Sequence, residues 1–176
     1  MSPGEIEFSY GPKGKPGLMD PSLPVRFNVS NSGSLAVYAF TEACDIGIDV
    51  EQVRPVPEME QIAARFFAAD EASELMALPE PERPQGFFNC WTRKEAYIKA
   101  VGDGLSVPLD SFRVTLRPGA DAEMLCLGGS VGAAKGWALH AFAPAPEFVG
   151  ALAYPGSLRP VLFAPLLTTE ALLNSL

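Results

Sequence analysis

The first part of the chain alternates apolar and polar positions in short runs. Residues 6–10 predict a short strand, and residues 25–30 and 34–40 predict a hairpin around the polar turn 31–33, because their apolar side chains partly alternate. Residues 46–50 are β-branched and apolar at most positions, which predicts a further strand.

The spacing of apolar residues then becomes helical. Residues 58–68 carry large apolar side chains at intervals of three and four, which predicts a helix. Asp70 is expected to cap a second helix over 71–78, because its carboxylate suits the free amides of a first turn. Residues 85–101 form the longest helical pattern, and Gly102 follows as a helix C-cap requires.

The last third of the chain returns to short apolar runs. Residues 105–154 predict four short strands separated by turns that contain Gly or Pro, and residues 160–176 predict a packed extension or a short helix. Since strands and helices do not alternate strictly, we expect an α+β protein and not a doubly wound sheet. The length of 176 residues suits one compact domain or two small lobes.

Composition narrows the class of protein. The net charge of −8 argues against nonspecific binding of nucleic acid, which needs a basic surface. No segment is long and apolar enough to span a bilayer, and the N-terminal residues do not resemble a secretory signal. Cys44, Cys90 and Cys126 form neither a CxxC pair nor a zinc pattern with His140. We therefore expect a reduced, cytoplasmic protein that binds neither nucleic acid nor membrane.

An acidic pair lies at the end of the strand predicted over 46–50. Asp49 and Glu51 are two positions apart, so a strand places both carboxylates on the same side. Adjacent like charges repel each other unless a cation lies between them, and Mg²⁺ prefers a few carboxylates with water or phosphate oxygens. The pair is a candidate metal site, although taken alone such a pair is more often a solvated turn.

A second polar group lies on the helix predicted over 85–101. Glu95 and Lys99 are four residues apart and share a helix face, as an ordinary surface ion pair does. Trp91 lies one turn earlier and gives that face an apolar flank, which favours a cleft. In a cleft, Glu95 could be a third metal ligand, and Lys94 and Lys99 could offer positive charge to phosphates. The residues alone leave both interpretations open.

The turn 31–33 and the lysines upstream of it suit an anion. Ser30, Asn31 and the glycine that follows them present hydroxyl, amide and backbone N–H groups of the kind that bind phosphate. Such a turn is nevertheless more often only part of a hairpin. Lys13 and Lys15 are of a kind that is commonly solvated in loops, and they could also reach a phosphate.

Three segments occur in the order FNVSNSG, IGIDVE and FFNCWTRKEAYIKAVGDGL. This set resembles the signature of the 4′-phosphopantetheinyl transferases of the surfactin-synthetase-activating (Sfp) type. That family carries a Ser-His-Ser turn, a Gly-(Ile/Val)-Asp-(Ile/Val)-Glu strand and a Trp-(Ser/Thr)-x-Lys-Glu-(Ala/Ser)-x-x-Lys helix. The last two motifs match fully, and the resemblance extends from about residue 5 to residue 155.

The resemblance implies a fold and a reaction. The fold would be that of a 4′-phosphopantetheinyl transferase, with strands packed against a long central helix. The reaction would be Mg²⁺-dependent transfer of 4′-phosphopantetheine from coenzyme A to a serine of an apo acyl or peptidyl carrier protein, with release of 3′,5′-ADP. The implied site residues are, for the metal, Asp49, Glu51 and Glu95; for catalysis, Glu95 and Lys99; and for coenzyme A, Lys15, Ser30, Asn31 and Lys94.

The chain departs from the family pattern in two places. Asn31 stands where the family has His and brings no positive charge, so we expect weaker affinity for coenzyme A. Family members have two pseudo-repeated halves, and the resemblance implies that the first is truncated here: residues 1–45 would be a remnant of the first lobe and residues 46–176 the second lobe with the metal site. Apolar surface left uncovered would be covered in a homodimer.

Two other functions stay open at this point. The chain could be a non-catalytic relative that binds coenzyme A or a carrier protein, or an interaction protein with a vestigial acidic site. The intact carboxylates and Lys99 favour an enzyme, whereas Asn31 favours a binding module. Because carrier proteins are usually acidic, a local basic patch is expected to contact them, formed by Arg65, Arg93, Lys94 and Lys99.

Overall fold

The computed structural model describes residues 3–102, 104–168 and 170–171. Its strands are β1 (Phe8–Tyr10), β2 (Pro16–Leu18), β3 (Arg26–Ser32), β4 (Leu35–Thr41), β5 (Gly47–Gln52), β6 (Phe112–Val114), β7 (Met124–Leu127), β8 (Trp137–Phe142) and β9 (Phe148–Pro155). Its α-helices are α1 (Met59–Phe66), α2 (Ala69–Ala77), α3 (Arg83–Val101) and α4 (Val131–Ala134). Short 3₁₀ turns lie at Pro3–Glu5, Glu80–Glu82, Gly104–Ser106 and Leu109–Ser111. The mixture confirms the predicted α+β class.

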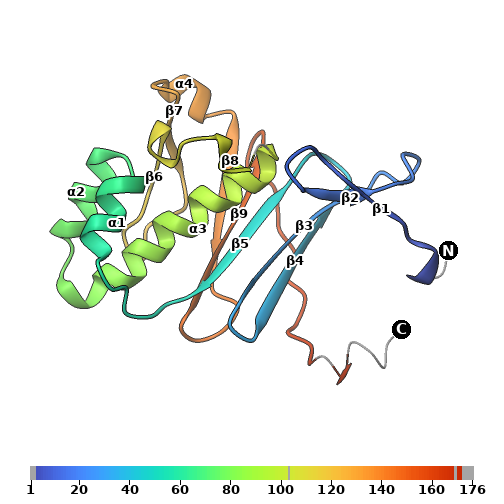
Figure 1. Cartoon of the computed structure of the whole chain (residues 1–176), viewed down its shortest axis with the longest axis horizontal. Coiled ribbons are helices and arrows are strands. Elements are labelled where there is room, and N and C mark those ends of the chain that lie inside the picture. Colours follow the sequence, from blue (N-terminus) through green and yellow to red (C-terminus); the bar gives the residue numbers. More distant parts are fainter. Residues whose placement is uncertain (1–2, 103, 169, 172–176) are drawn as a thin grey trace.

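An antiparallel three-stranded sheet in the order β5-β9-β8 forms the centre of the fold, and α3 crosses one of its faces (Figure 1). Successive side chains of β9 alternate between two apolar clusters, as a strand requires. Ala151 and Ala153 are fully buried toward α3, and their small size lets the helix approach closely. Leu152 and Tyr154 pack in the second cluster, on the opposite face.

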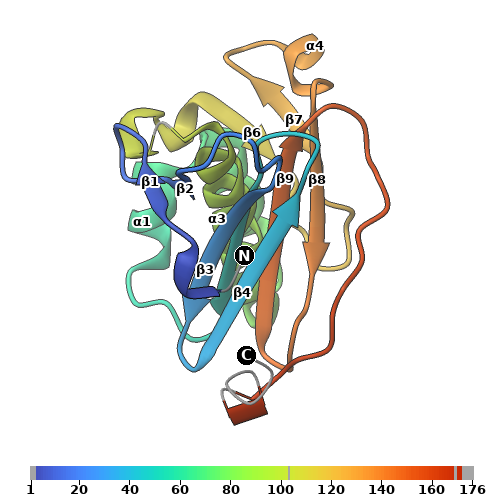
Figure 2. The ribbon, with the colours of Figure 1, turned by 90° about the vertical axis from the view of Figure 1, so that its right-hand side faces the viewer.

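The hairpin predicted over 25–40 is confirmed as β3 and β4, which pair in antiparallel register from Arg26 with Thr41 to Ser32 with Leu35. Its turn is at residues 33–34 and not at 31–33, because the pairing continues through Ser32. Gly33 lies in the turn with φ of 56°, a backbone angle that suits glycine. Figure 2 shows the hairpin in front of the central sheet, with β3 and β4 running alongside each other. This arrangement brings the polar positions of β3 next to β5.

The first two helices are confirmed, but the predicted cap of the second is wrong. The helix α2 begins two residues earlier than expected, with Ala68 as its N-cap. The carboxylate of Glu71 accepts a hydrogen bond from the Ala68 backbone N–H at 2.9 Å and so satisfies a free amide at the helix start. Asp70 is instead exposed and pairs with Arg113 at 2.7 Å.

The long helix α3 matches its prediction closely. It begins at Arg83, two residues before the predicted start, because Pro84 falls in the first turn, where no backbone N–H is needed. Gly102 ends the helix with φ of 82° and donates its N–H to the Ile98 carbonyl at 2.9 Å. The predicted glycine C-cap is therefore confirmed.

The rest of the chain contains the four predicted short strands and one unpredicted helix, α4. Ser130 caps α4 by accepting a hydrogen bond from the Ala133 N–H at 3.1 Å.

The prediction that the tail packs as an extension or forms a short helix is confirmed in part. Residues 160–168 have no regular structure and Leu162 is 96% exposed, but Val161 packs against the second apolar cluster and the Phe163 ring lies 5.7 Å from that of Phe142. Residues 170–171 are helical, and the prediction for residues 169 and 172–176 lies outside the described residues.

The three cysteines are free thiols, as expected. Cys90 is fully buried in α3, where burial raises the pKa of its thiol well above the ordinary value. Within the residues that the structure describes, no helix has the length and hydrophobicity needed to cross a membrane.

The strand β5 and the helix α3 approach closely at Gly47, and replacement of this glycine is predicted to separate them. A Cβ atom at this position would collide with the backbone of Ala96 and Ala100. We expect Gly47→Ala to lower the free energy of unfolding by about 1–3 kcal/mol, the usual cost of overpacking. Urea unfolding measures this change. A matched control is Gly4→Ala, where nothing lies within 4 Å of the added atom; equal stability losses in the two variants would contradict the prediction.

Candidate active site

The candidate site begins with the acidic pair on β5. Asp49 and Glu51 lie on the same side of the strand, and Asp49 is only 5% exposed. The Lys99 ammonium contacts Asp49 Oδ1 at 2.7 Å, and the Ser30 hydroxyl donates to the same oxygen at 2.9 Å. The other oxygen, Oδ2, is buried and has no hydrogen-bond partner among the described residues. A buried carboxylate oxygen without a partner is costly, so it marks a place for a further ligand.

The helix α3 supplies the second half of the site. Glu95 and Lys99 stand one turn apart on the face that meets β5, as their spacing predicted. Lys99 is half-buried and spans from the helix to the strand, since it also contacts the Ser30 hydroxyl at 3.0 Å. The close approach at Gly47 therefore brings the helix and strand motifs together.

The carboxyl groups of this site have raised pKa values. Burial raises the pKa of Asp49, and the nearby charge of Glu51 raises it further, although Lys99 and the Ser30 hydroxyl act in the opposite direction. Burial also raises the pKa of Glu95, as do the charges of Asp49 and Glu51, against the lowering effect of Lys99. The three carboxylates thus repel one another in a poorly solvated region, which favours a bound cation.

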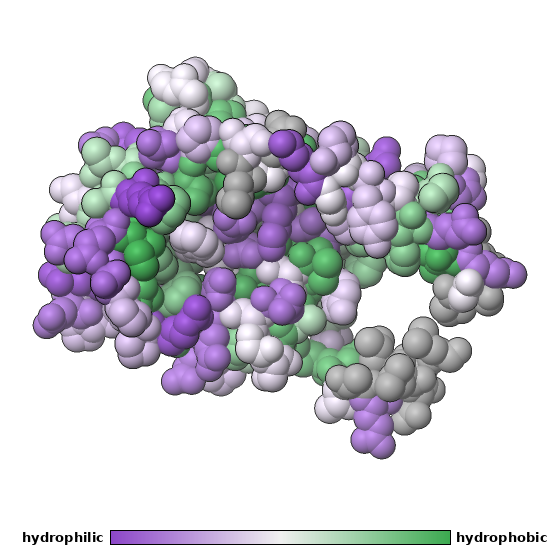
Figure 3. Space-filling model, viewed as in Figure 1, coloured by the Kyte–Doolittle hydropathy of each residue, from purple (hydrophilic) through white to green (hydrophobic). Residues whose placement is uncertain are grey.

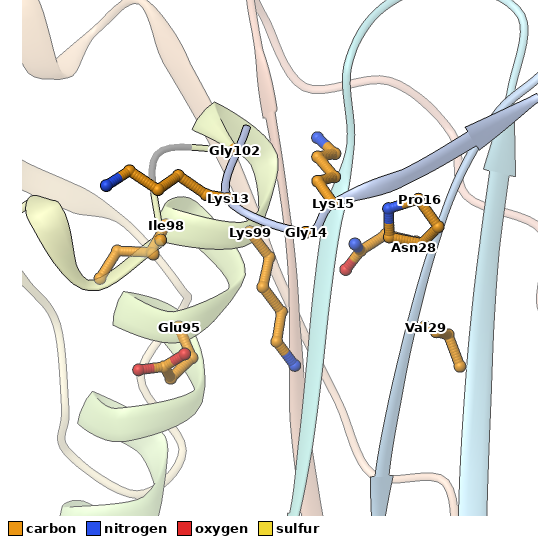
Figure 4. Close-up of a pocket in the computed structure, with 11 residues that line it drawn as sticks. Lys13, Gly14, Lys15, Pro16, Asn28, Val29, Glu95, Ile98, Lys99 and Gly102 are labelled. Carbon is orange, nitrogen blue, oxygen red and sulfur yellow. The ribbon is translucent and has the colours of Figure 1, made fainter. Parts of the chain in front are cut away.

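A cleft of about 250 Å³ opens beside these residues (Figure 4). Glu95 and Lys99 line it from α3, Asn28 lines it from β3, and Lys13 and Lys15 line it from the loop between β1 and β2. In the space-filling view, hydrophilic side chains gather midway along the molecule, over α3 and β5 (Figure 3). The three lysines that line the cleft give it positive charge that suits an anion, although the whole chain has a net charge of −8.

Lys15 is fixed at the end of α3. Its ammonium donates to the Ala100 carbonyl at 2.8 Å, where the helix dipole is negative. Burial lowers the pKa of Lys15, while the charge of Asp45 raises it. Lys15 therefore lies on the wall of the cleft, a position compatible with the prediction that it lies near a bound nucleotide.

Two residues proposed for coenzyme A lie elsewhere. Lys94 is fully buried and bonds Glu71 at 2.7 Å and the carbonyl oxygens of Leu109 and Phe112, which uses all its N–H groups. The geometry contradicts the expectation that Lys94 contacts a phosphate. Asn31 is exposed on the side of β3 opposite to Ser30, because strand positions alternate.

The expected basic patch for a carrier protein is also incomplete. Arg93 is 2% exposed, and its guanidinium donates to the Thr115 carbonyl at 2.6 Å and to the Ala120 carbonyl at 3.2 Å. Together with the burial of Lys94, this leaves only Arg65, exposed on α1, and the half-buried Lys99 from the predicted group.

Sequence reasoning assigned no role to two residues of the site. Ser32 donates a hydrogen bond to Glu51 at 2.7 Å, and Asn28 lines the cleft together with Lys13, which the sequence had offered as a phosphate contact. Asn28, Ser30 and Ser32 are polar residues at every second position of a predicted strand. This alternation was the available signal that one face of β3 meets a polar partner.

The chemical types of the side chains at this site suit a divalent cation. The described residues contain no group of three or more His, Cys, Asp or Glu side chains already arranged to hold a metal ion. The available donors are nevertheless carboxylate oxygens, which Mg²⁺ prefers. Asp49 Oδ2 has free capacity, and burial, together with the charges of Asp49 and Glu51, raises the pKa of Glu95.

The raised pKa values predict that Mg²⁺ binds more weakly at low pH. Asp49 and Glu95 keep their protons above the pH at which ordinary carboxyl groups, with pKa values of 3.8 and 4.5, lose them. A cation must displace these protons, so its apparent affinity rises with pH and levels off once both groups are ionised. Without the cation, stability changes in the other direction: the raised pKa values favour folding at low pH, and this contribution is lost as pH rises through them.

Magnesium titrations across a pH series from about 5 to 8, followed by thermal unfolding, measure both trends. An affinity for Mg²⁺ that does not change over this range would contradict the prediction.

Comparison with known proteins agrees with this geometry. Residues 45–148 match the family model of the 4′-phosphopantetheinyl transferase superfamily, a match that covers more than half of the chain. The chain therefore belongs to this superfamily.

Individual relatives show how far the similarity extends. The 4′-phosphopantetheinyl transferase HetI of Nostoc sp. is 36% identical over 158 residues, which cover 89% of this chain and 63% of HetI. The 4′-phosphopantetheinyl transferase Sfp of Bacillus subtilis is 42% identical over 117 residues, which cover 66% of this chain and 50% of Sfp. The chain thus spans about half to two thirds of the length of these relatives.

Among solved structures, the holo-acyl-carrier-protein synthase AcpS of Thermotoga maritima superimposes with a TM-score of 0.49 at 23% identity, covering 65% of this chain and 64% of that one. The narrower resemblance to the Sfp type stays a prediction, since HetI matches a larger share of this chain than Sfp does.

Proposed function

We propose that this chain transfers 4′-phosphopantetheine from coenzyme A to a serine of an apo acyl or peptidyl carrier protein. The observation that carries the proposal is the buried Asp49, with one oxygen on Lys99 and the other free, beside Glu95 at the edge of a lysine-lined cleft. A pyrophosphate needs a site that combines cationic groups with carboxylates for a metal ion, and this cleft offers both.

The lysines of the cleft would bind phosphate groups, and Glu95 would accept a proton. Lys13 and Lys15 would hold phosphate groups of coenzyme A at the mouth of the cleft. Lys99 would neutralise charge that develops on the pyrophosphate. Glu95, whose pKa burial raises, would accept the proton of the carrier serine as that oxygen forms its bond to phosphorus. The phosphorus–oxygen bond to 3′,5′-ADP breaks in the same exchange.

Asp49, Glu51 and Glu95 would hold Mg²⁺. When bound, the ion would supply a positive charge that stabilises the negative charge of the transferring phosphoryl group. Ser30 is placed to orient Asp49 and lies near the cleft, so a contact with a phosphate of coenzyme A remains part of the proposal. Asn31 stays a predicted contact on the exposed side of β3.

The proposal also covers the division into lobes, the subtype of the enzyme and its oligomeric state. We assign residues 1–45 to a first lobe and 46–176 to the lobe with the metal site, in a cytoplasmic enzyme of the Sfp type. Large apolar side chains of the first segment are exposed, among them Tyr10 at 71% and Phe40 at 67%, which supports a homodimer.

A non-catalytic relative is the second candidate. Asn31 replaces the positively charged residue of the family motif, and the carboxylates are not yet arranged around a metal. A relative of this kind would bind coenzyme A or a carrier protein without turnover.

Release of 3′,5′-ADP tests the proposed function and separates it from the second candidate. The chain is incubated with coenzyme A, Mg²⁺ and an apo carrier protein, and nucleotide products are separated by chromatography. We expect 3′,5′-ADP to accumulate only with the apo carrier, and not with a carrier whose acceptor serine is replaced by alanine. Thermal stabilisation by coenzyme A without release of 3′,5′-ADP would favour the binding module.

A further inference from the structure

The strand β3 is joined to β5 by side chains. The side-chain oxygens of Asn28, Ser30 and Ser32 accept hydrogen bonds from the backbone N–H groups of Ile48, Val50 and Gln52 at 2.9, 3.3 and 3.1 Å. These contacts advance by two residues on both strands, so β3 and β5 run in the same direction. The side chain of every second residue of β3 thereby accepts a hydrogen bond that a backbone carbonyl would accept in a regular sheet.

Two of these three side chains also donate a hydrogen bond to the acidic pair. The Ser30 hydroxyl donates to Asp49 at 2.9 Å, and the Ser32 hydroxyl donates to Glu51 at 2.7 Å. A serine hydroxyl has one proton to donate and two lone pairs to accept with. Because the amide of Gln52 occupies a lone pair of Ser32, the hydroxyl proton is directed toward Glu51.

Glu51 depends on Ser32 more than Asp49 depends on Ser30. Asp49 has the Lys99 ammonium as a second close partner at 2.7 Å. Among the described residues, Glu51 also pairs with Arg54, at 3.5 Å, and the Arg54 side chain is 57% exposed. A long ion pair to an exposed arginine restrains a glutamate only weakly. The short bond from Ser32 is therefore the stronger restraint on the Glu51 carboxylate.

We propose that Ser32 is a positioning residue, which holds the Glu51 carboxylate in the orientation needed to bind the divalent cation. This inference rests on the proposed function, because it assigns Glu51 to the metal. A glutamate side chain has several rotatable bonds, and a partner that fixes its orientation before the ion arrives removes part of the ordering cost from binding. Charge-assisted bonds from a hydroxyl to a carboxylate are strong enough to do this.

The effect should be visible in metal affinity. Loss of a hydrogen-bond partner of a metal ligand typically weakens metal binding by 10–100-fold, and for this partly exposed pair we expect about tenfold for Ser32→Ala. Ser32→Thr keeps the hydroxyl and should restore the affinity to within about twofold. Ser34→Ala is the matched control, because Ser34 lies exposed in the same hairpin turn.

Binding is measured with Mn²⁺ as the probe, followed by the loss of the electron paramagnetic resonance signal of free Mn²⁺, with Mg²⁺ as competitor. Transfer to an apo carrier protein is measured in parallel over a range of Mg²⁺ concentrations. We expect Ser32→Ala to need about tenfold more Mg²⁺ for half-maximal rate and to recover most of the rate at saturation. Lower stability alone would reduce the amount of active protein and leave the half-saturating concentration unchanged.

The outcomes separate this inference from the proposed function. If Ser32→Ala binds Mn²⁺ as tightly as the unaltered chain, or if Ser32→Thr is as weak as Ser32→Ala, Ser32 does not position Glu51. If the unaltered chain transfers phosphopantetheine but takes up no metal, the inference fails and transfer stands. If the unaltered chain takes up metal with the expected dependence on Ser32 but transfers nothing, the inference stands and the proposed function fails.

Discussion

Replacing Asp49 by Asn is expected to reduce the rate of phosphopantetheine transfer by about 10²–10³-fold. The substitution keeps the size of the side chain but removes the negative charge that we propose binds the metal ion and that pairs with Lys99. Metal ions contribute several kcal/mol to stabilising charge in a transition state, and each 1.36 kcal/mol corresponds to a tenfold change in rate. The loss should fall on kcat at saturating coenzyme A.

The folded state should tolerate this change. Burial raises the pKa of Asp49, so the ionised carboxylate is itself unfavourable in its surroundings, and an uncharged amide avoids that cost. The unfolding midpoint is therefore expected to stay close to that of the unaltered chain. Asp70→Asn removes a carboxylate that is 68% exposed on α2, and it should keep full activity. Near-normal turnover by the Asp49→Asn variant would show that Asp49 is not part of the active site.

Replacing Lys94 by Met is expected to lower the free energy of unfolding by about 3–5 kcal/mol. Lys94 is fully buried, and Glu71, its partner at 2.7 Å, is 1% exposed. Removing the ammonium leaves a buried carboxylate uncompensated and two carbonyl oxygens, of Leu109 and Phe112, without a donor. Urea unfolding of the variant measures the loss directly.

Two comparisons identify the cause of that loss. Lys135→Met removes an exposed lysine at the end of α4 and should change stability by less than about 0.5 kcal/mol. Adding Glu71→Gln to Lys94→Met should recover part of the lost stability, because the unpaired charge is removed. If Lys94→Met were as stable as the unaltered chain and bound coenzyme A less well, Lys94 would be a phosphate ligand after all.

The pieces of the site that sequence predicted are those with a local pattern. The strand 46–50 and the helix 85–101 follow from spacing of apolar residues, and their polar residues fall on definite faces. Asp49, Glu95 and Lys99 therefore lie together as expected, because β5 and α3 are neighbours in the fold. Gly102 was likewise readable as a cap, since only local geometry decides it.

One error concerns a residue whose partners are distant in sequence. Lys94 is adjacent to Glu95 in the motif, but its side chain contacts Glu71 of α2 and carbonyl oxygens near β6. No spacing rule reports such tertiary partners. The error at Asp70 is local: Glu71 accepts a hydrogen bond from the N–H of Ala68, three residues earlier, so the helix starts before Asp70.

The role of Ser32 could not be predicted, because its partner lies on another strand. Serines are common in hairpins without any further function, and only the position of β3 beside β5 shows that the hydroxyls of Ser30 and Ser32 contact carboxylates. The tail packs only in part: Val161 and Phe163 contact the rest of the protein, whereas Leu162 and Leu167 are exposed at 96% and 62%.

Intact-mass spectrometry of an apo carrier protein tests the central claim most directly. The carrier is incubated with coenzyme A, Mg²⁺ and either the unaltered chain or Asp49→Asn, with EDTA added to a third sample. The proposal predicts that the carrier protein gains the mass of one phosphopantetheine group only in the sample that contains the unaltered chain and no EDTA. No gain with the folded, unaltered chain, while a longer relative modifies the same carrier, would contradict it.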